Sequence, residues 1–151
     1  MRVVLQRVSE ASVVVDGETV GAIGRGVLLL VGVERGDTAD DAAVLVRKVA
    51  RLRIFPEGER PMHRTLAEVE GGCLVVSQFT LLASLRKGNR PGFDRAEDPA
   101  PAAALCDAFA EALRGEGLPV ETGRFGADMA VSLVNDGPVT LLLESRDGRM
   151  A

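Results

Sequence analysis

The sequence predicts a single α/β domain built on a mixed β-sheet, and three observations support that fold class. The chain has 151 residues, of which 46% are hydrophobic and 26% are charged, values typical of one globular domain with a substantial core. Two amphipathic helix patterns occur singly between stretches rich in β-branched residues, as in α/β folds. No internal repeat or linker divides the chain, so we expect residues 1–151 to form one domain.

The first 33 residues predict a β-meander. Residues 2–8 and 12–15 alternate with β-branched apolar residues and favour two strands, and Asp16-Gly17 is a strong hairpin-turn signal. Residues 19–23 then return as a third strand. The apolar run 27–33 predicts a buried central strand.

The next segment predicts the first helix, over residues 38–52. Thr38 and Asp41 have the spacing of a capping box, and apolar residues follow at helical spacing up to Leu52. We expect a short strand at 53–55 and a loop over 56–61.

The second half of the chain predicts one more buried strand, one helix and three closing strands. The strand covers residues 73–77, and a basic loop follows over 83–98. Asp98-Pro99 opens the second helix as N-cap and first helical residue, and glycines end it near residue 115. The closing strands are expected at 120–124, 129–134 and 139–143.

The composition excludes several classes of site. Two cysteines and one histidine are too few for a disulfide framework, a four-thiolate metal site or a two-histidine zinc site, so we expect no metal and no cofactor. Cys73 and Cys106 fit core thiols, and His63 fits an exposed loop residue. The longest apolar run is far shorter than a membrane span, and Met1–Arg7 lacks the apolar segment of a secretory signal.

Charge is distributed unevenly along this acidic chain. Residues 47–95 carry ten Lys and Arg but only five Asp and Glu, whereas the flanking segments are net acidic. A local basic patch can hold a polyanion whatever the net charge of the protein is. Scattered, solvated arginines are the alternative reading. The candidate contacts in the basic loop are Arg86, Lys87 and Arg90.

Ser77-Gln78-Phe79-Thr80 is the first candidate site. Ligands of α/β sheets bind beyond the carboxyl ends of strands, and backbone N–H groups released from the ladder there can face an oxyanion. Ordinary strand termination by polar residues is the alternative. A hydrolase with Thr80 as nucleophile is a second alternative, although no neighbouring His or Lys supplies a base.

Asn135-Asp136-Gly137-Pro138-Val139-Thr140 is the second candidate site. These residues are ordinary turn formers between two apolar strands. However, an X–Pro bond adopts the cis form at a cost of only about 0.5–1 kcal/mol, and glycine adds freedom of φ. Gly137-Pro138 can therefore direct two carbonyl oxygens the same way, which no side chain reproduces.

Together these segments resemble the D-aminoacyl-tRNA deacylase family. Residues 77–81 match one family signature and residues 135–140 match the other. Further similarity is found at 6–8, 11–13, 90–91 and 122–129, so the resemblance runs from residue 2 to about residue 145. The chain departs from the family pattern at Met62-His63 and at Cys106, to which we assign no functional role.

The resemblance implies a cytoplasmic homodimer with a three-layer α/β/β fold that hydrolyses the ester between a D-amino acid and tRNA. The implied active site lies at the dimer interface, where a Gly137-cis-Pro138 step enters the partner's pocket beside Ser77–Thr80 and rejects L-amino acids. Arg7 is implied to brace that step. Aminoacyl-tRNA would be the partner, held through Arg86, Lys87 and Arg90, with no DNA or membrane involved. Activity on glycyl-tRNA is left open.

The chemistry is compatible with this resemblance. An aminoacyl ester is already activated by its ammonium group and its sugar leaving group, and oriented N–H donors contribute about 2.7–4 kcal/mol each. The terminal 2′-OH of the RNA would assist proton transfer, as the resemblance suggests. A non-catalytic RNA- or nucleotide-binding module is the rival class, and it would need no cis step.

Overall fold

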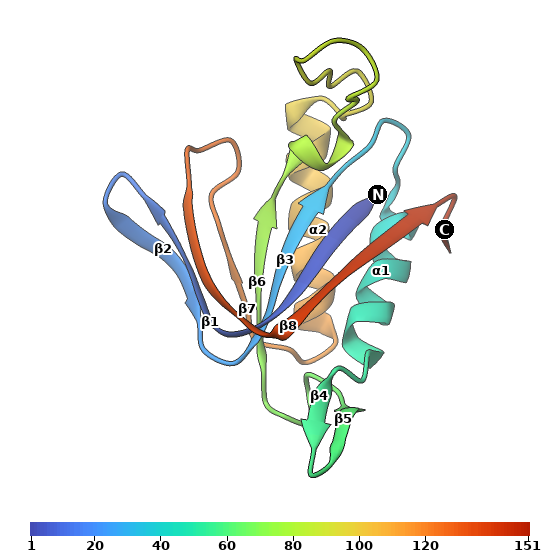
Figure 1. Cartoon of the computed structure of the whole chain (residues 1–151). Coiled ribbons are helices and arrows are strands. Elements are labelled where there is room, and N and C mark those ends of the chain that lie inside the picture. The colour runs from blue at the N-terminus through green and yellow to red at the C-terminus, as the bar shows by residue number, and fades with distance from the viewer.

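One long, bent sheet organises the chain (Figure 1). The computed structural model describes all residues, 1–151. The strand order is β7-β6-β3-β1-β8-β9, and β2 also pairs with β1. The β3–β6 and β6–β7 pairs are parallel and the pairs made by β1 are antiparallel, so the predicted mixed sheet is confirmed. The strands are β1 (Arg2–Val15), β2 (Glu18–Ile23), β3 (Gly26–Gly32), β6 (Gly72–Ser77), β7 (Val120–Thr122), β8 (Ala130–Arg146) and β9 (Arg149–Met150).

β1 and β8 are longer than the sequence predicted. The expected strands at 2–8 and 12–15 form one strand, because neither Gly nor Pro lies between them and the chain pairs with β8 from Arg2 to Val14, with two register shifts. Likewise, the strands expected at 129–134 and 139–143 are joined into β8. The turn formers between them make an irregularity in the ladder opposite Arg7, where the register shifts, rather than a chain reversal.

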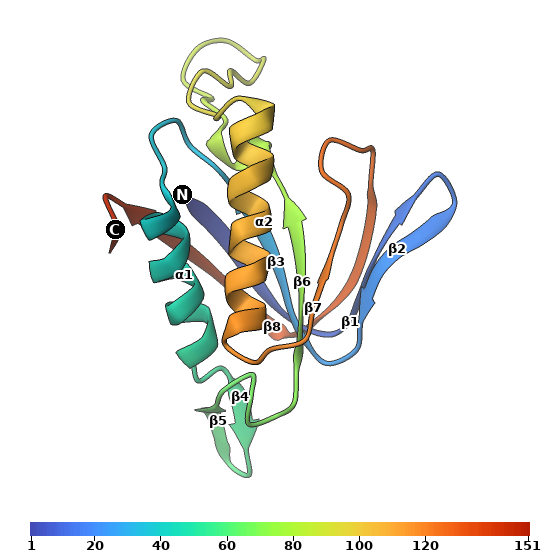
Figure 2. The ribbon, with the colours of Figure 1, turned by 180° about the vertical axis from the view of Figure 1, so that it is seen from behind.

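Two helices cover one face of the sheet (Figure 2). Helix α1 (Ala39–Arg51) begins after Thr38, whose N–H donates to the Asp41 carboxylate at 2.9 Å as the predicted capping box requires. Helix α2 (Pro99–Gly115) has Asp98 as N-cap, also as predicted. Neither helix is long and apolar enough to cross a membrane.

Two separate cores show that the domain has three layers. Alternate residues of β3 point to opposite faces: Leu29 belongs to the core against the helices. Leu28 belongs to a second core against the curled-over halves of β1 and β8. β6 divides in the same way, with Val75 on the helix side and Leu74 on the other. The predicted α/β/β arrangement is therefore confirmed.

Three smaller elements differ from the prediction. The loop expected over 56–61 is part of a hairpin formed by β4 (Phe55–Glu57) and β5 (Arg60–Arg64), with Gly58 at positive φ in its turn. The strand expected at 53–55 is reduced to Phe55, where β4 begins. The 3-10 helix η1 (Phe79–Leu82) and the short strand β9 were not predicted.

β3 and β6 approach each other through a pair of glycines. Gly26 lies opposite Gly72 in the parallel register, and a Cβ on Gly26 would lie only 1.9 Å from the Gly72 carbonyl oxygen. The residue pair therefore admits no side chain at position 26. The close contact lies where the parallel pairing of β3 and β6 begins.

Candidate active site

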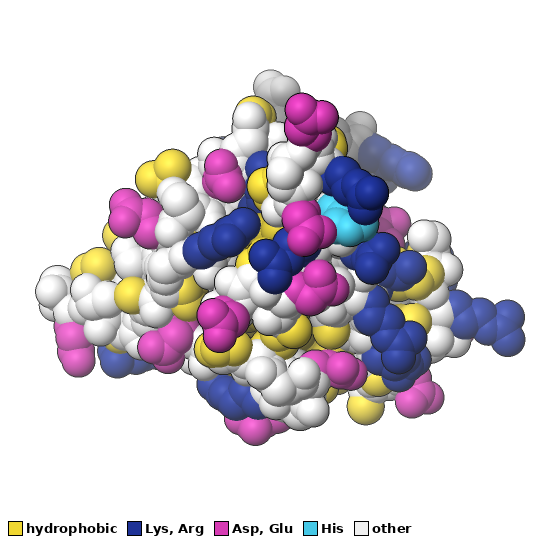
Figure 3. Space-filling view, turned by 90° about the horizontal axis from the view of Figure 1, so that it is seen from below, with side chains coloured by type: hydrophobic (Ala, Val, Ile, Leu, Met, Phe, Trp, Pro, Cys, Tyr) yellow, Lys and Arg dark blue, Asp and Glu magenta, His cyan; other side chains and the backbone are white.

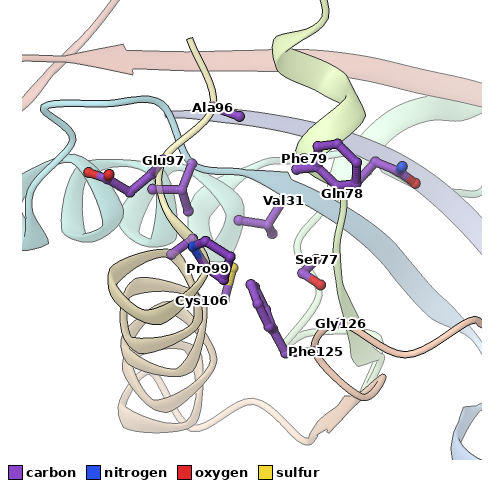
Figure 4. A pocket seen from close by; sticks show the side chains of 12 residues that line it. Val31, Ser77, Gln78, Phe79, Ala96, Glu97, Pro99, Cys106, Phe125 and Gly126 are labelled. Carbon is purple, nitrogen blue, oxygen red and sulfur yellow. The ribbon is translucent and has the colours of Figure 1, made fainter. Parts of the chain in front are cut away.

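A pocket of about 300 Å³ lies beyond the carboxyl ends of β3 and β6 (Figure 4). It is enclosed by the end of the sheet, the first half of α2 and the loop after β7. This is where ligands bind in open α/β sheets. Its main lining residues are Ser77, Gln78, Phe79, Cys106, Phe125 and Gly126.

The polar segment after β6 forms one wall of the pocket because the strand ladder ends there. The Gln78 N–H makes the last sheet contact, to the Val31 carbonyl at 2.8 Å. The chain then turns into η1, whose first internal bond runs from the Leu81 N–H to the Gln78 carbonyl at 3.2 Å. The N–H groups of Phe79 and Thr80 precede that bond, so η1 offers them no carbonyl partner.

Thr80 is the one predicted residue of this segment that does not line the pocket. Its side chain is exposed, and its hydroxyl oxygen accepts a hydrogen bond from the Gln78 amide. An amide cannot act as a general base. Phe79 is 59% exposed and makes an edge-to-face contact with Phe93 at a centroid distance of 4.9 Å.

The opposite wall contains residues to which sequence reasoning gave no site role. Phe125 and Gly126, in the loop after β7, lie near Ser77 and line the pocket in Figure 4, and the only sequence signal for them was their place in the 122–129 segment. Cys106 was correctly predicted to be a buried thiol, at 8% exposure, but it also borders the pocket. Burial, together with the neighbouring Asp107 carboxylate, raises the pKa of Cys106 to about 11, so it is an unreactive, apolar surface at neutral pH.

The Gly137-Pro138 step lies in the irregular part of β8 and faces solvent. The peptide bond is cis, in agreement with the expectation from the sequence, and Gly137 has a φ of 138°. Arg7, only 8% exposed, reaches across from β1. Its Nε donates to the Asp136 carbonyl at 2.9 Å and its Nη1 donates to the Ile54 carbonyl at 2.6 Å. Arg7 therefore ties the residue preceding the step to the segment after α1.

Within one chain, the pocket and the step lie far apart. Arg7 is opposite Val27, and Val27 is opposite Cys73, near the beginning of β6. Ser77 lies four residues further along, which is about 13 Å at ~3.3 Å per residue, and the three strand spacings add about 14 Å sideways. In Figure 1 the step is at the bend of β8 at the bottom, whereas η1 is at the top. One copy of the chain does not bring its two candidate sites together.

The structure divides the predicted basic region into two clusters. Arg86, Lys87 and Arg90 are exposed on the loop that follows η1. The cations of residues 47–64 lie at the other end, around the end of α1 and the β4–β5 hairpin. His63 is there too, half-buried and 3.1 Å from the Glu57 carboxylate. No group of three or more His, Cys, Asp or Glu side chains is arranged to hold a metal ion.

Comparison with known proteins gives consistent relatives over nearly the whole chain. The family model described as D-Tyr-tRNA(Tyr) deacylase matches residues 4–144. A Thermomicrobium roseum protein named D-aminoacyl-tRNA deacylase is 60% identical, covering 99% of this chain and 97% of its own. An Anaeromyxobacter dehalogenans protein of the same name is 59% identical, covering 97% and 98%.

Two solved structures have the same fold. One, described as c-Myc DNA Unwinding Element Binding Protein, has a TM-score of 0.87 at 42% identity and covers 97% of this chain and 99% of its own. The other, described as a probable eukaryotic D-amino acid tRNA deacylase, has a TM-score of 0.81 at 23% identity, covering 93% and 97%. The second likeness concerns the fold alone.

Proposed function

This chain belongs to the D-Tyr-tRNA(Tyr) deacylase family, and from that premise we propose that its pocket at Ser77–Phe79 receives the aminoacyl ester of a D-aminoacyl-tRNA. The chain is a hydrolase of the D-aminoacyl-tRNA deacylase kind. Water is added across the ester, which releases the D-amino acid and leaves the tRNA with a free 3′-terminal hydroxyl.

The observation that carries this proposal is the start of η1 beside the pocket: Phe79 lines the pocket, and η1 offers no carbonyl partner to the N–H groups of Phe79 and of the next residue, Thr80. Attack of water on the ester carbonyl develops negative charge on its oxygen. Two fixed N–H donors stabilise that oxyanion, and each contributes about 2.7–4 kcal/mol in comparable sites. Because the ester is already activated, this electrostatic contribution replaces a protein nucleophile. The 2′-OH of the terminal ribose is the proposed proton relay.

The selection of D-amino acids is assigned to the Gly137-Pro138 step of a second copy. The step is exposed, and Arg7 holds the carbonyl of Asp136, the residue immediately before it. In a homodimer it would close the partner's pocket and collide with an L side chain. A glycyl ester has no side chain to reject, so glycyl-tRNA is a further candidate substrate.

The activity is tested by incubating the purified protein with D-Phe-tRNA and L-Phe-tRNA in parallel. We expect rapid release of D-Phe and little release of L-Phe. Glycyl-tRNA is measured as a third arm. Equal rates on the two enantiomers, or no turnover at micromolar enzyme, would contradict the proposal.

The dimeric arrangement is tested separately by cross-linking. Phe79→Cys and Pro138→Cys are made in two differently tagged copies, which are mixed and treated with a short bis-maleimide. Because both positions are exposed and lie at opposite ends of one chain, a covalent heterodimer reports the step of one copy at the pocket of the other. Glu116→Cys, also exposed, replaces Pro138→Cys as the matched control. Absence of a cross-link, together with a monomer in light scattering, would exclude the arrangement.

A non-catalytic nucleic-acid-binding role remains the alternative with a specific observation behind it. The 42% identical structure is named for binding a DNA element, and basic side chains contact the phosphates of DNA and RNA alike. Turnover of D-Phe-tRNA excludes a purely non-catalytic role, and competition then compares the two nucleic acids: we expect uncharged tRNA to inhibit deacylation well below the concentration at which a DNA duplex of equal phosphate content does so.

A further inference from the structure

We propose that the tRNA-binding surface is composite, with each bound tRNA contacting basic residues from both copies of the chain. One contribution is the loop cluster, Arg86, Lys87 and Arg90, of the copy that supplies the pocket. The other is the helix-end cluster, Arg47, Lys48, Arg51 and Arg53, of the copy that supplies the Gly137-Pro138 step. This inference rests on the proposed cross-subunit site and concerns where the phosphates are held.

The helix-end cluster has the character of a phosphate-binding surface. All four of its side chains are exposed, and none takes part in an ion pair. No carboxylate occurs between Arg47 and Phe55. Arg47 and Arg51 are four residues apart and therefore neighbours on the helix surface. Figure 3 looks onto this end of the molecule, where Lys and Arg side chains surround the single histidine, with carboxylates between them.

Hydrogen bonds from Arg7 connect the segment of the helix-end cluster to the segment of the Gly137-Pro138 step. Arg53 immediately precedes Ile54, whose carbonyl accepts the 2.6 Å hydrogen bond from Arg7. The same guanidinium holds the Asp136 carbonyl at 2.9 Å. One buried side chain thus joins the segment that carries the cluster to the segment that carries the step. Wherever the step is placed, the cluster is placed beside it.

The loop cluster is connected to the pocket in a similar way. The base of its loop is closed by two backbone hydrogen bonds between Ser84 and Gly92, of 2.7 and 2.9 Å. Phe93, at the end of the same loop, packs edge to face on Phe79 in the pocket wall. The loop cluster therefore keeps its place relative to the pocket.

These two connections determine which charges a bound tRNA meets. In one chain the clusters lie at opposite ends, as Figure 1 shows for the loop after η1 and the end of α1. When the Gly137-Pro138 step of one copy enters the pocket of the second copy, the helix-end cluster of the first copy approaches the loop cluster of the second. A tRNA with its 3′ end in that pocket then contacts basic side chains on both sides. Contacts to phosphate position the nucleic acid without reading its sequence, which suits an enzyme that acts on many tRNAs.

A mixed dimer provides the test. Arg51→Gln/Arg53→Gln and Arg86→Gln/Lys87→Gln are made in separately tagged copies, and the heterodimer is purified by tandem affinity. With a composite surface, the heterodimer has one intact surface and one that carries all four changes. We expect about half of the wild-type kcat, with the KM and the salt dependence of the wild type. Each variant homodimer should have a raised KM and a salt slope reduced by at most about two.

Two results would overturn the proposal. If the heterodimer has the raised KM of the variant homodimers, and none of its activity shows the wild-type KM, the surface is formed within one chain. If neither homodimer changes KM or its salt dependence, the clusters do not bind tRNA. Arg146→Gln/Arg149→Gln, on exposed residues far along β8 and β9, is the control for loss of two charges. Failure of the function itself is seen in the wild type, which would then not hydrolyse D-Phe-tRNA, and failure of the dimer is seen in cross-linking.

Discussion

Arg7 connects the backbone just before the step to a distant segment, since one guanidinium donates to the Asp136 and Ile54 carbonyls. An ammonium group lacks the planar fork that reaches both. We expect Arg7→Lys to lower the free energy of unfolding by about 1–3 kcal/mol, because one buried carbonyl loses its donor. We also expect it to lower the ratio of D to L rates. Urea denaturation and paired single-turnover assays measure the two effects. An unchanged rate ratio in a destabilised variant would show that Arg7 supports the fold only.

Thr80 is expected to assist catalysis through a hydrogen bond and not as a nucleophile. Its hydroxyl is paired with the Gln78 amide, and no base contacts it. Thr80→Ala should therefore retain measurable deacylation, reduced about 10–100-fold by the loss of the one hydrogen bond between Thr80 and the Gln78 amide. Rates on D-Phe-tRNA measure this loss. Detection by mass spectrometry of an aminoacyl group on Thr80 in the wild type would contradict it.

The two buried thiols predict a loss of stability at alkaline pH. Burial raises the pKa of Cys73 to about 12, and burial with the Asp107 charge raises that of Cys106 to about 11, from an ordinary 9.0. Above pH 9 the unfolded chain releases these protons and the folded chain keeps them, so the free energy of unfolding falls as pH rises. Between pH 8 and pH 10 we expect a loss of about 2–3 kcal/mol in urea denaturation under reducing conditions. Cys73→Ala/Cys106→Ala should be less stable at pH 8 but should show a flatter pH dependence.

At the scale of elements, the parallel pair β3–β6 depends on a side chain being absent. A Cβ at Gly26 would overlap the Gly72 carbonyl oxygen, and backbone cannot move aside as a flexible side chain can. We expect Gly26→Ala to destabilise the fold by about 3 kcal/mol or more. Gly24→Ala, two residues away with nothing within 4 Å of its Cβ position, is the matched control and should be nearly neutral. Thermal denaturation of the pair compares them directly, and similar midpoints would contradict the close approach.

The sequence predicted elements wherever a local signal existed. The capping box at Thr38, the Asp98-Pro99 helix start and the buried strands around Leu29 and Val75 all depend on neighbours in sequence, and all are confirmed. The continuity of β8 was missed because Asn135–Pro138 has turn chemistry, whereas in the structure β8 pairs with β1 on both sides of this irregularity, at Asn135 and again at Thr140.

The same distinction applies to the candidate site. Ser77, Gln78 and Phe79 were predicted because a strand visibly ends there. Phe125 and Cys106 come from distant elements, and their place in the pocket is set by the packing of α2 and the loop after β7 on the sheet. No local pattern encodes that packing.

At the scale of the whole molecule, binding and chiral selection are expected to be separable. In the proposed complex the loop cluster contacts phosphate, whereas the Gly137-Pro138 step faces the α-carbon. Arg86→Gln/Lys87→Gln should therefore raise KM and lower its salt slope by at most about two, with little change in the ratio of D to L rates. Assays from 50 to 300 mM salt with both enantiomers measure this. A lower ratio of D to L rates with an unchanged salt slope would show that the loop discriminates between the two enantiomers of the amino acid.

The distance between pocket and step within one chain has a consequence for mixed populations of chains. In the proposed dimer a twofold axis lets two copies satisfy both contacts at once, so assembly stops at two and no filament grows. Each of the two active sites then takes its pocket from one copy of the chain and its Gly137-Pro138 step from the other copy. When a fraction of the chains carries a defect in the step alone, the working centres decline in proportion to that fraction. When both defects lie on one chain, a centre survives only if both of its contributors are intact, so the survivors decline as the square of the intact fraction. A double defect on a plasmid-borne copy should thus interfere with the resident gene more strongly than either defect alone.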